Sequence, residues 1–93
     1  MARIARRVAV TGRVTGVGFR YAALRAAAEL PGLTGFVRNA DWDTVECVIQ
    51  GESEQVEAMT AWLRRGPLGA EVSGCQVSSI PVLEGREPFH IAD

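Results

Sequence analysis

The chain has 93 residues, of which 47% are hydrophobic and 23% charged, and its formal net charge is −1. This composition is typical of one ordinary globular domain, and a slightly negative chain gains no general electrostatic support for binding nucleic acid. No apolar run approaches the roughly 18 residues that a membrane span requires, and the arginines near the start are not followed by the apolar stretch of a signal peptide. We therefore expect a single domain over residues 1–93, located in the cytoplasm, with no membrane or nucleic-acid partner.

The predicted elements follow the order strand, helix, strand, strand, helix, strand. In chain order they are a strand over 4–11, a helix over 19–30, strands over 33–40 and 44–50, a helix from Ser53 to the stop at Gly66 and Pro67, a strand over 70–80 and a short strand over 89–92. This order is that of the ferredoxin-like βαββαβ sandwich, an α+β fold with an antiparallel sheet and two helices on one face.

Both predicted helices carry one stripe of apolar or small residues at helical spacing, so each is expected to bury one side. The stripes are Ala23, Ala26, Ala27 and Leu30 in the first helix, and Val56, Met59, Thr60 and Leu63 in the second. Ser53 is the predicted N-cap of the second helix. In the last long strand the apolar residues change parity before Cys75, which predicts a β-bulge near Gly74.

The two cysteines, Cys47 and Cys75, lie far apart and lack a CxxC spacing. Each lies among strand-forming residues, so we expect buried free thiols, which suit a reducing compartment. The single histidine, His90, is expected to be a surface or packing residue, because no cluster of Cys, Asp or Glu accompanies it. The sequence therefore predicts no metal site and no cofactor.

A glycine-rich segment, Gly12-Arg13-Val14-Thr15-Gly16-Val17-Gly18-Phe19-Arg20, joins the first strand to the first helix. Glycine lets successive backbone N–H groups point inward and lets an anion approach closely. The start of the helix adds free N–H groups and partial positive charge, and Arg20 can add a forked guanidinium. The segment predicts a phosphate-binding loop. Its spacing matches neither a Walker A loop nor GxGxxG, however, and a tight turn beside a surface arginine explains the glycines equally well.

A second candidate residue, Asn39, ends the run Gly35-Phe36-Val37-Arg38-Asn39. An asparagine before a turn is more often a turn former than a functional residue. The sequence does not show whether this strand end comes near the glycine-rich segment.

Considered together, the run from Val10 to Arg20 and the run from Gly35 to Asn39 resemble the two signatures of the acylphosphatase family. The resemblance continues through Val45-Glu46, Ala61-Trp62-Leu63 and the Gly66-Pro67 stop, so it covers nearly the whole chain. It implies a ferredoxin-like fold and a metal-independent hydrolase that splits the carboxyl-phosphate bond of small acyl phosphates into a carboxylate and orthophosphate.

The same resemblance implies the roles of individual residues. The phosphate would be bound by Thr15, Gly16, Val17, Gly18, Phe19 and Arg20, and Asn39 would orient the attacking water. Arg20 and Asn39 are therefore the predicted catalytic residues. We expect the chain to act on its small-molecule substrate as a monomer.

Three positions depart from the family pattern. Thr15 stands where Gln is usual, Phe36 where Trp is common, and Trp42-Asp43 where the hairpin usually carries Asp-Gly. Without the glycine, the turn loses the residue best able to take a positive φ, although Asp43 can take the left-handed conformation at modest cost. The result should be an altered turn, with Trp42 exposed or folded over the hairpin, rather than a broken strand pair.

Two alternatives to an active hydrolase stay open. Ferredoxin-like sheets include RNA-binding modules that stack bases on aromatic strand residues, although this chain offers few aromatic residues and lacks the corresponding motif. A domain of the acylphosphatase type could also bind phosphate without turning a substrate over. Arg13 and Arg38 are either solvated strand residues or a source of positive potential near the site.

Overall fold

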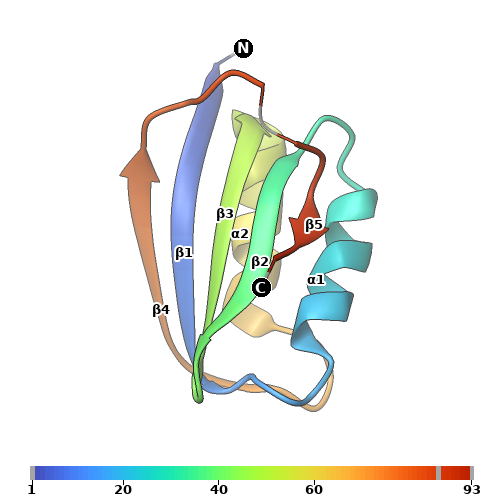
Figure 1. Cartoon of the computed structure of the whole chain (residues 1–93), viewed down its shortest axis with the longest axis vertical. Coiled ribbons are helices and arrows are strands. Elements are labelled where there is room, and N and C mark those ends of the chain that lie inside the picture. The colour runs from blue at the N-terminus through green and yellow to red at the C-terminus, as the bar shows by residue number, and fades with distance from the viewer. Residues whose placement is uncertain (1, 86, 93) are drawn as a thin grey trace.

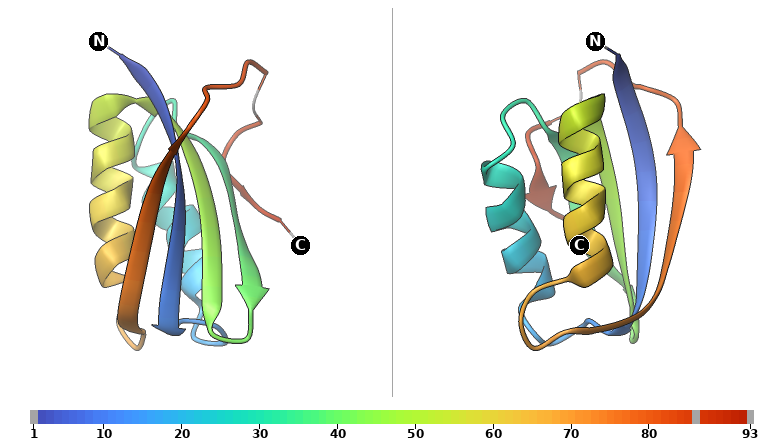
Figure 2. Two further views of the ribbon diagram at one scale, coloured as in Figure 1. Left: turned by 90° about the vertical axis from the view of Figure 1, so that its left-hand side faces the viewer. Right: turned by 180° about the vertical axis from the view of Figure 1, so that it is seen from behind.

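The computed structural model describes residues 2–85 and 87–92. The elements in this part of the chain are β1 (Arg3–Arg13), α1 (Phe19–Ala28), β2 (Thr34–Asp41), β3 (Thr44–Glu52), α2 (Ser53–Arg65), β4 (Glu71–Ile80) and β5 (His90–Ile91). The strands form one sheet in the order β4-β1-β3-β2-β5 (Figure 1). Both helices lie against the same face of this sheet (Figure 2). The predicted ferredoxin-like α+β fold is confirmed, with β1 and β3 in the centre.

The four long strands form the predicted antiparallel sheet, and the short β5 makes the whole sheet mixed. β1 pairs antiparallel with β3 and β4, and β2 pairs antiparallel with β3. The short β5 instead runs parallel to β2, with Phe36 opposite His90. After β4 the chain crosses the end of the sheet and then descends beside β2, which fixes the direction of β5 (Figure 1). A two-residue strand carries no signal of this direction in its own sequence.

The hydrophobic core lies between the sheet and the two helices. Alternate residues of the strands supply one side of it, and the helix stripes supply the other. Its buried members include Val8, Val10, Val37, Val45, Cys47 and Ile49 from the strands, and Phe19, Ala23, Ala27, Val56, Met59 and Leu63 from the helices. The stripe predicted for α2 is confirmed, because its fourth member, Thr60, is buried together with Val56, Met59 and Leu63.

The helix boundaries differ from the prediction in two places. α1 ends at Ala28, before Leu30, because its last turn tightens to hydrogen bonds that reach only three residues back. At the start of α2, Ser53 is the first helical residue rather than the cap, and Glu52 in the cap position makes no side-chain hydrogen bond. The Ser53 N–H donates to the carbonyl of Ala2 at 2.9 Å instead. The N-terminal segment thus supplies an acceptor for the first N–H of the helix.

The bulge predicted near Gly74 is present one residue earlier, at Ser73. Thr11 lies opposite Gly74, but Gly12 lies opposite Val72, so Ser73 is an extra residue on β4. The Ser73 hydroxyl donates to the Thr11 carbonyl at 3.2 Å.

The two cysteines are free thiols in different surroundings. Cys47 is fully buried, and burial raises the pKa of its thiol. Cys75 is only half-buried, so the expectation of two buried thiols holds for Cys47 alone. Neither helix in the described part of the chain is long and apolar enough to cross a membrane.

The turn between β2 and β3 is altered while the strand pair is kept, as predicted. No non-glycine residue within 2–85 and 87–92 has a positive φ, so Asp43 does not use the left-handed conformation open to it. The pairing shifts instead: Asn39 lies opposite Val45 and Asp41 opposite Thr44, which makes Ala40 an extra residue on β2. This shift lets the chain reverse without glycine.

Candidate active site

The glycine-rich loop between β1 and α1 is held by alternate side chains. Val14 and Phe19 are buried, and Val17 packs against the core. Between them, Gly16 and Gly18 are exposed and adopt left-handed backbone conformations, with φ values of 73° and 75°. Such values favour glycine strongly. The loop is therefore anchored to the core by these side chains, while its backbone at the two glycines faces solvent.

The first glycine of the motif has a different purpose. A Cβ added at Gly12 would lie 2.2 Å from the carbonyl oxygen of Glu71 on β4. A Cβ added at Gly16 or Gly18 would meet no atom within 4 Å. Gly12 thus permits the close approach of β1 and β4, whereas the other two glycines border open space.

The backbone N–H groups of this loop are free to bind a ligand. From residue 15 to residue 21, no N–H donates a hydrogen bond to another group in the described part of the chain. The first hydrogen bond of α1 runs from the Ala22 N–H to the Gly18 carbonyl at 2.9 Å. Free donors at a helix N-terminus, together with the helix dipole, favour an anion.

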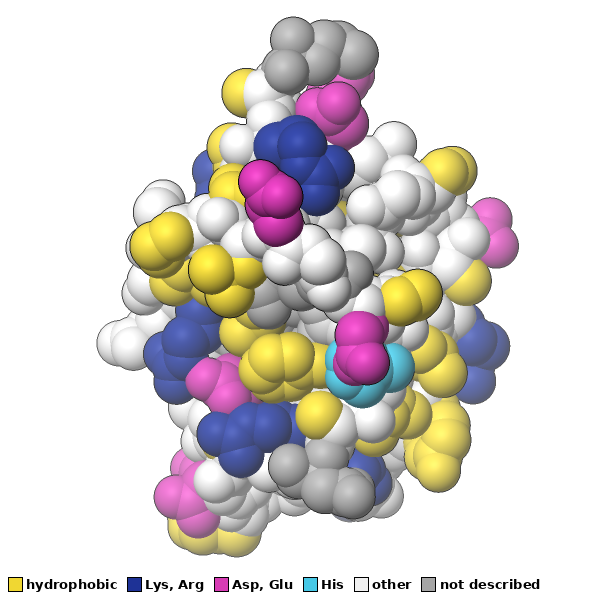
Figure 3. Space-filling model, turned by 45° about the horizontal axis from the view of Figure 1, so that its top comes forward, with side chains coloured by type: hydrophobic (Ala, Val, Ile, Leu, Met, Phe, Trp, Pro, Cys, Tyr) yellow, Lys and Arg dark blue, Asp and Glu magenta, His cyan; other side chains and the backbone are white. Residues whose placement is uncertain are grey.

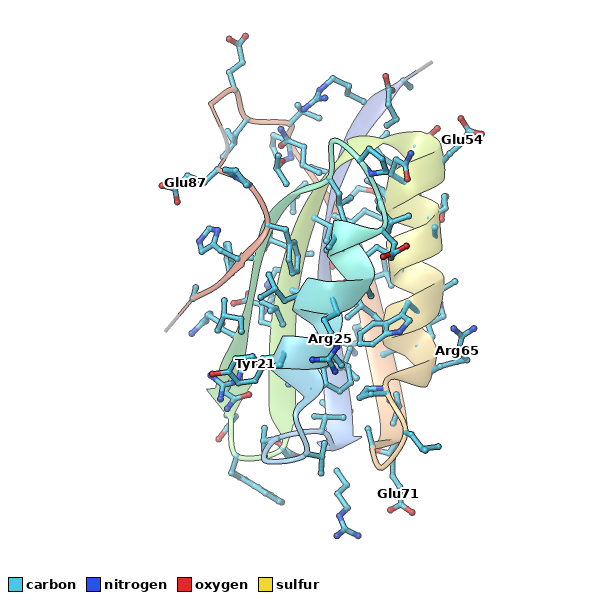
Figure 4. All side chains as sticks on the ribbon, turned by 90° about the vertical axis from the view of Figure 1, so that its right-hand side faces the viewer. Tyr21, Arg25, Glu54, Arg65, Glu71 and Glu87 are labelled. Atoms are coloured by element: carbon cyan, nitrogen blue, oxygen red, sulfur yellow. The ribbon has the colours of Figure 1, made fainter. Side chains whose placement is uncertain are left out.

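Arg20 adds an uncompensated positive charge next to these donors. It is the second residue of α1 and is half-buried. Its guanidinium forms no hydrogen bond or ion pair with the residues that the structure describes, whereas Arg6, Arg7 and Arg38 are each paired with a glutamate. The neighbouring Tyr21 projects from the first turn of α1 on the side of β2, away from α2 (Figure 4).

Asn39 lies near the end of β2 and on the same side of the sheet as the loop. Side chains alternate along a strand. Because Val37 points into the core under the helices, Asn39 two residues later faces the helix side. Its side chain is exposed. The loop and the end of β2 both lie at the lower end of the molecule in Figure 1.

Direct contacts join the glycine-rich loop to the hairpin turn that follows Asn39. The Thr15 hydroxyl donates to the carbonyl of Trp42 in the β2–β3 turn at 2.5 Å, and the Gly12 N–H donates to the carbonyl of Asp43 at 3.0 Å. The Trp42 side chain is 81% exposed, as predicted. Next to these contacts lies a hollow of about 350 Å³, lined by Gly12, Arg13, Thr15, Trp42 and Asp43. The fold therefore brings the glycine-rich loop and the hairpin after Asn39 to one place.

The opposite face of the sheet carries a charged cluster that was not predicted. Glu46 on β3 accepts hydrogen bonds from Arg7 on β1 and from Arg38 on β2. Burial opposes ionisation of this carboxyl, but the two guanidinium partners outweigh burial and hold its pKa below the ordinary value. Of the two arginines left open by the sequence, Arg38 is thus ion-paired and Arg13 is exposed. A charged residue between Val45 and Cys47 in a strand was the available signal.

His90 lies on the edge strand β5, apart from these contacts. Its Nδ1 is 2.8 Å from the Pro88 carbonyl, and its ring lies 6.3 Å from that of Phe36. Within residues 2–85 and 87–92, no three His, Cys, Asp or Glu side chains gather in a way that could hold a metal ion.

Comparison with known proteins identifies the family. A family model described as acylphosphatase matches residues 6–91. The chain belongs to the acylphosphatase family. An acylphosphatase from Pseudomonas paraeruginosa is 49% identical over 89 residues, which cover 96% of each chain. Among solved structures, an acylphosphatase from Coxiella burnetii has a TM-score of 0.87 at 37% identity, covering 97% of this chain and 93% of its own.

A further solved acylphosphatase, from Bacillus subtilis, has a TM-score of 0.89 at 31% identity and covers 97% of this chain and 99% of its own. Acylphosphatases of such similarity, matched over at least 93% of their length, favour a hydrolase over the RNA-binding alternative. The resemblance stated from the two signatures is confirmed.

Proposed function

We propose that this chain hydrolyses the carboxyl-phosphate bond of small acyl phosphates, releasing a carboxylate and orthophosphate, with no metal ion. The observation that carries the proposal is that, within residues 2–85 and 87–92, no partner is found for the N–H groups from residue 15 to residue 21 or for the guanidinium of Arg20. The proposal takes residues 1–93 as one domain that acts as a monomer. A cytoplasmic location is consistent with the two free thiols.

The chemistry asks little of the protein beyond binding and placement. An acyl phosphate is a mixed anhydride whose leaving group is a carboxylate, a weak base that departs without protonation by a general acid. Phosphoryl transfer then depends mostly on positioning and on stabilising charge at the equatorial oxygens. In the proposed complex, the N–H groups of Thr15 to Arg20 and the fork of Arg20 supply that stabilisation.

The attacking water is the second component. In the proposed mechanism, the Asn39 side-chain amide holds the water in line with the leaving carboxylate, because an amide can both donate and accept a hydrogen bond. The water's proton passes to the bound phosphate. Support comes from the helix-facing side of β2 on which Asn39 lies and from the Thr15–Trp42 contact that links the loop to the adjoining turn.

The test is hydrolysis of benzoyl phosphate in the presence of EDTA. We expect the wild type to be active, and Arg20→Ala to lose about 100-fold or more in kcat/KM and to bind inorganic phosphate more weakly. Arg20→Lys should rescue poorly, since one ammonium cannot copy the guanidinium fork. Arg25→Ala is the matched control, because Arg25 lies on the same helix, is exposed and is likewise unpaired among the described residues.

Asn39→Ala tests the water-positioning role separately. It should lower kcat far more than it changes KM. A folded Asn39→Ala protein with full kcat would remove this role. A wild type that binds phosphate but shows no turnover would identify the domain as an inactive phosphate binder.

A further inference from the structure

A nearly buried carboxylate ties the three inner strands together on the face that the helices leave uncovered. Glu46 is 8% exposed. Its Oε1 accepts from Arg38 Nε at 2.6 Å, and its Oε2 accepts from Arg7 Nε. Figure 3 shows basic and acidic side chains next to one another on the surface. Each carboxylate oxygen therefore holds one neighbouring strand.

The strand pairing places this cluster one residue pair away from Asn39, on the opposite face of the sheet. Glu46 and Arg38 are opposite each other in the β2–β3 ladder, and the next pair is Asn39 with Val45. Immediately beyond, Ala40 is the extra residue at which the register shifts. Along β2, Asn39 thus lies between the ion-paired Arg38 and Ala40, the residue at which the strand register shifts.

Asn39 has little else to hold it in place. Its side chain is exposed and makes no hydrogen bond with the described residues. Its amide faces the helix side, whereas the neighbouring Arg38 points to the open face. Since consecutive residues of a strand share one backbone, fixing Arg38 fixes the direction in which Asn39 projects.

We propose that Glu46 is a positioning residue for hydrolysis: by holding Arg38 across the strand pair, it sets where the Asn39 amide holds the attacking water. This inference rests on the proposed function of Asn39. Glu46 touches neither the substrate nor the water. Its effect is on the rate of the chemical step rather than on phosphate binding, which belongs to the loop and Arg20.

The first test compares Glu46→Gln with a matched control, Glu57→Gln. Glu57 also pairs with an arginine, because Arg6 on β1 donates to both of its oxygens. Glu57 lies on α2, however, and its partner Arg6 on β1, so this pair includes no residue of β2. We expect Glu46→Gln to lower kcat on benzoyl phosphate by about 10- to 100-fold, with KM and inhibition by inorganic phosphate changed less than about 3-fold. Glu57→Gln should leave all three quantities near the wild-type values.

The second test replaces each of the two arginines that pair with Glu46 and keeps Glu46 itself. Arg38→Met should lower kcat as Glu46→Gln does, whereas Arg7→Met should not, because only Arg38 adjoins Asn39. This pair decides the question even if Glu46→Gln fails to fold. Equal kcat losses in the two arginine variants would overturn the inference. So would a rise in KM at unchanged kcat, which would indicate capture of the anionic substrate by charge.

A double-mutant cycle separates this inference from the proposed function. If Glu46 acts through Asn39, Glu46→Gln should lower kcat little further in an Asn39→Ala background. Full additivity would overturn the positioning role while leaving the wild-type activity and the Asn39→Ala loss intact. If instead Asn39→Ala alone keeps full kcat, the water-positioning part of the proposed function fails first, and the inference falls with it.

Discussion

Glycines only six residues apart in the loop segment should differ sharply in what alanine does to them. At Gly12, with φ of 129°, a Cβ would lie 2.2 Å from the Glu71 carbonyl oxygen and 2.8 Å from the Ser73 nitrogen. Both are backbone atoms, so β4 itself would have to move. Overpacking and a backbone conformation essentially restricted to glycine together predict a loss of about 3 kcal/mol or more in the free energy of unfolding.

At Gly18, with φ of 75°, the same substitution meets no atom within 4 Å. The cost is then only the left-handed conformation, about 1–2 kcal/mol, and it is offset by about 0.4–1 kcal/mol from the stiffer unfolded chain. We therefore expect Gly18→Ala to lose less than about 2 kcal/mol. Gly85→Ala is the matched control, because Gly85 has φ of 72° and equally open surroundings far from the loop in sequence.

Urea unfolding followed by far-ultraviolet circular dichroism measures all three variants. The expected order of destabilisation is Gly12→Ala well above Gly18→Ala, with Gly85→Ala close to the latter. A Gly12→Ala protein as stable as Gly18→Ala would refute the reasoning, since it would mean that β1 and β4 can separate at no cost.

Three further outcomes are expected. In the native protein, Ellman's reagent should modify Cys75 but not Cys47, whose thiol is fully buried and has a raised pKa; two fast-reacting thiols would contradict this. Because the pKa of Glu46 is lowered on folding, its contribution to stability is complete above the ordinary carboxyl pKa of about 4.3 and is lost as the pH falls through the folded value. Glu46→Gln should therefore flatten the decline of the urea midpoint below about pH 5, and identical acid limbs would argue against it. Trp42→Phe should remove most of the acrylamide-accessible fluorescence and leave the emission of the half-buried Trp62; unchanged quenching would mean that Trp42 is shielded.

The fold was predictable because its signals are periodic and repeated. The α2 stripe from Val56 to Leu63 and the apolar residues of the central strands each recur several times, so no single residue decides the assignment. The predictions that failed each depended on one local signal. Ser53 was assigned as a cap, but it is the first helical residue, and its N–H donates to Ala2, which is remote in sequence.

The candidate site was predictable only in part, for a similar reason. The loop and Asn39 stood out by residue type and by resemblance to a family. The hairpin reverses without glycine because the register shifts at Ala40. This shift depends on how β2 and β3 pair, and no sequence pattern predicts it. The Glu46 cluster needs three strands to be placed side by side before Arg7 and Arg38 meet one carboxylate.

The way the loop is anchored makes this protein's chemistry inseparable from its folding. Val14, Val17 and Phe19 hold the proposed anion-binding backbone in place because their side chains pack into the same core that joins the helices to the sheet. A molecule whose core has unfolded no longer holds this loop in place and should therefore be inactive. Residual turnover along a thermal or urea titration should therefore count native molecules, and an inexpensive colorimetric assay would serve as a folding probe.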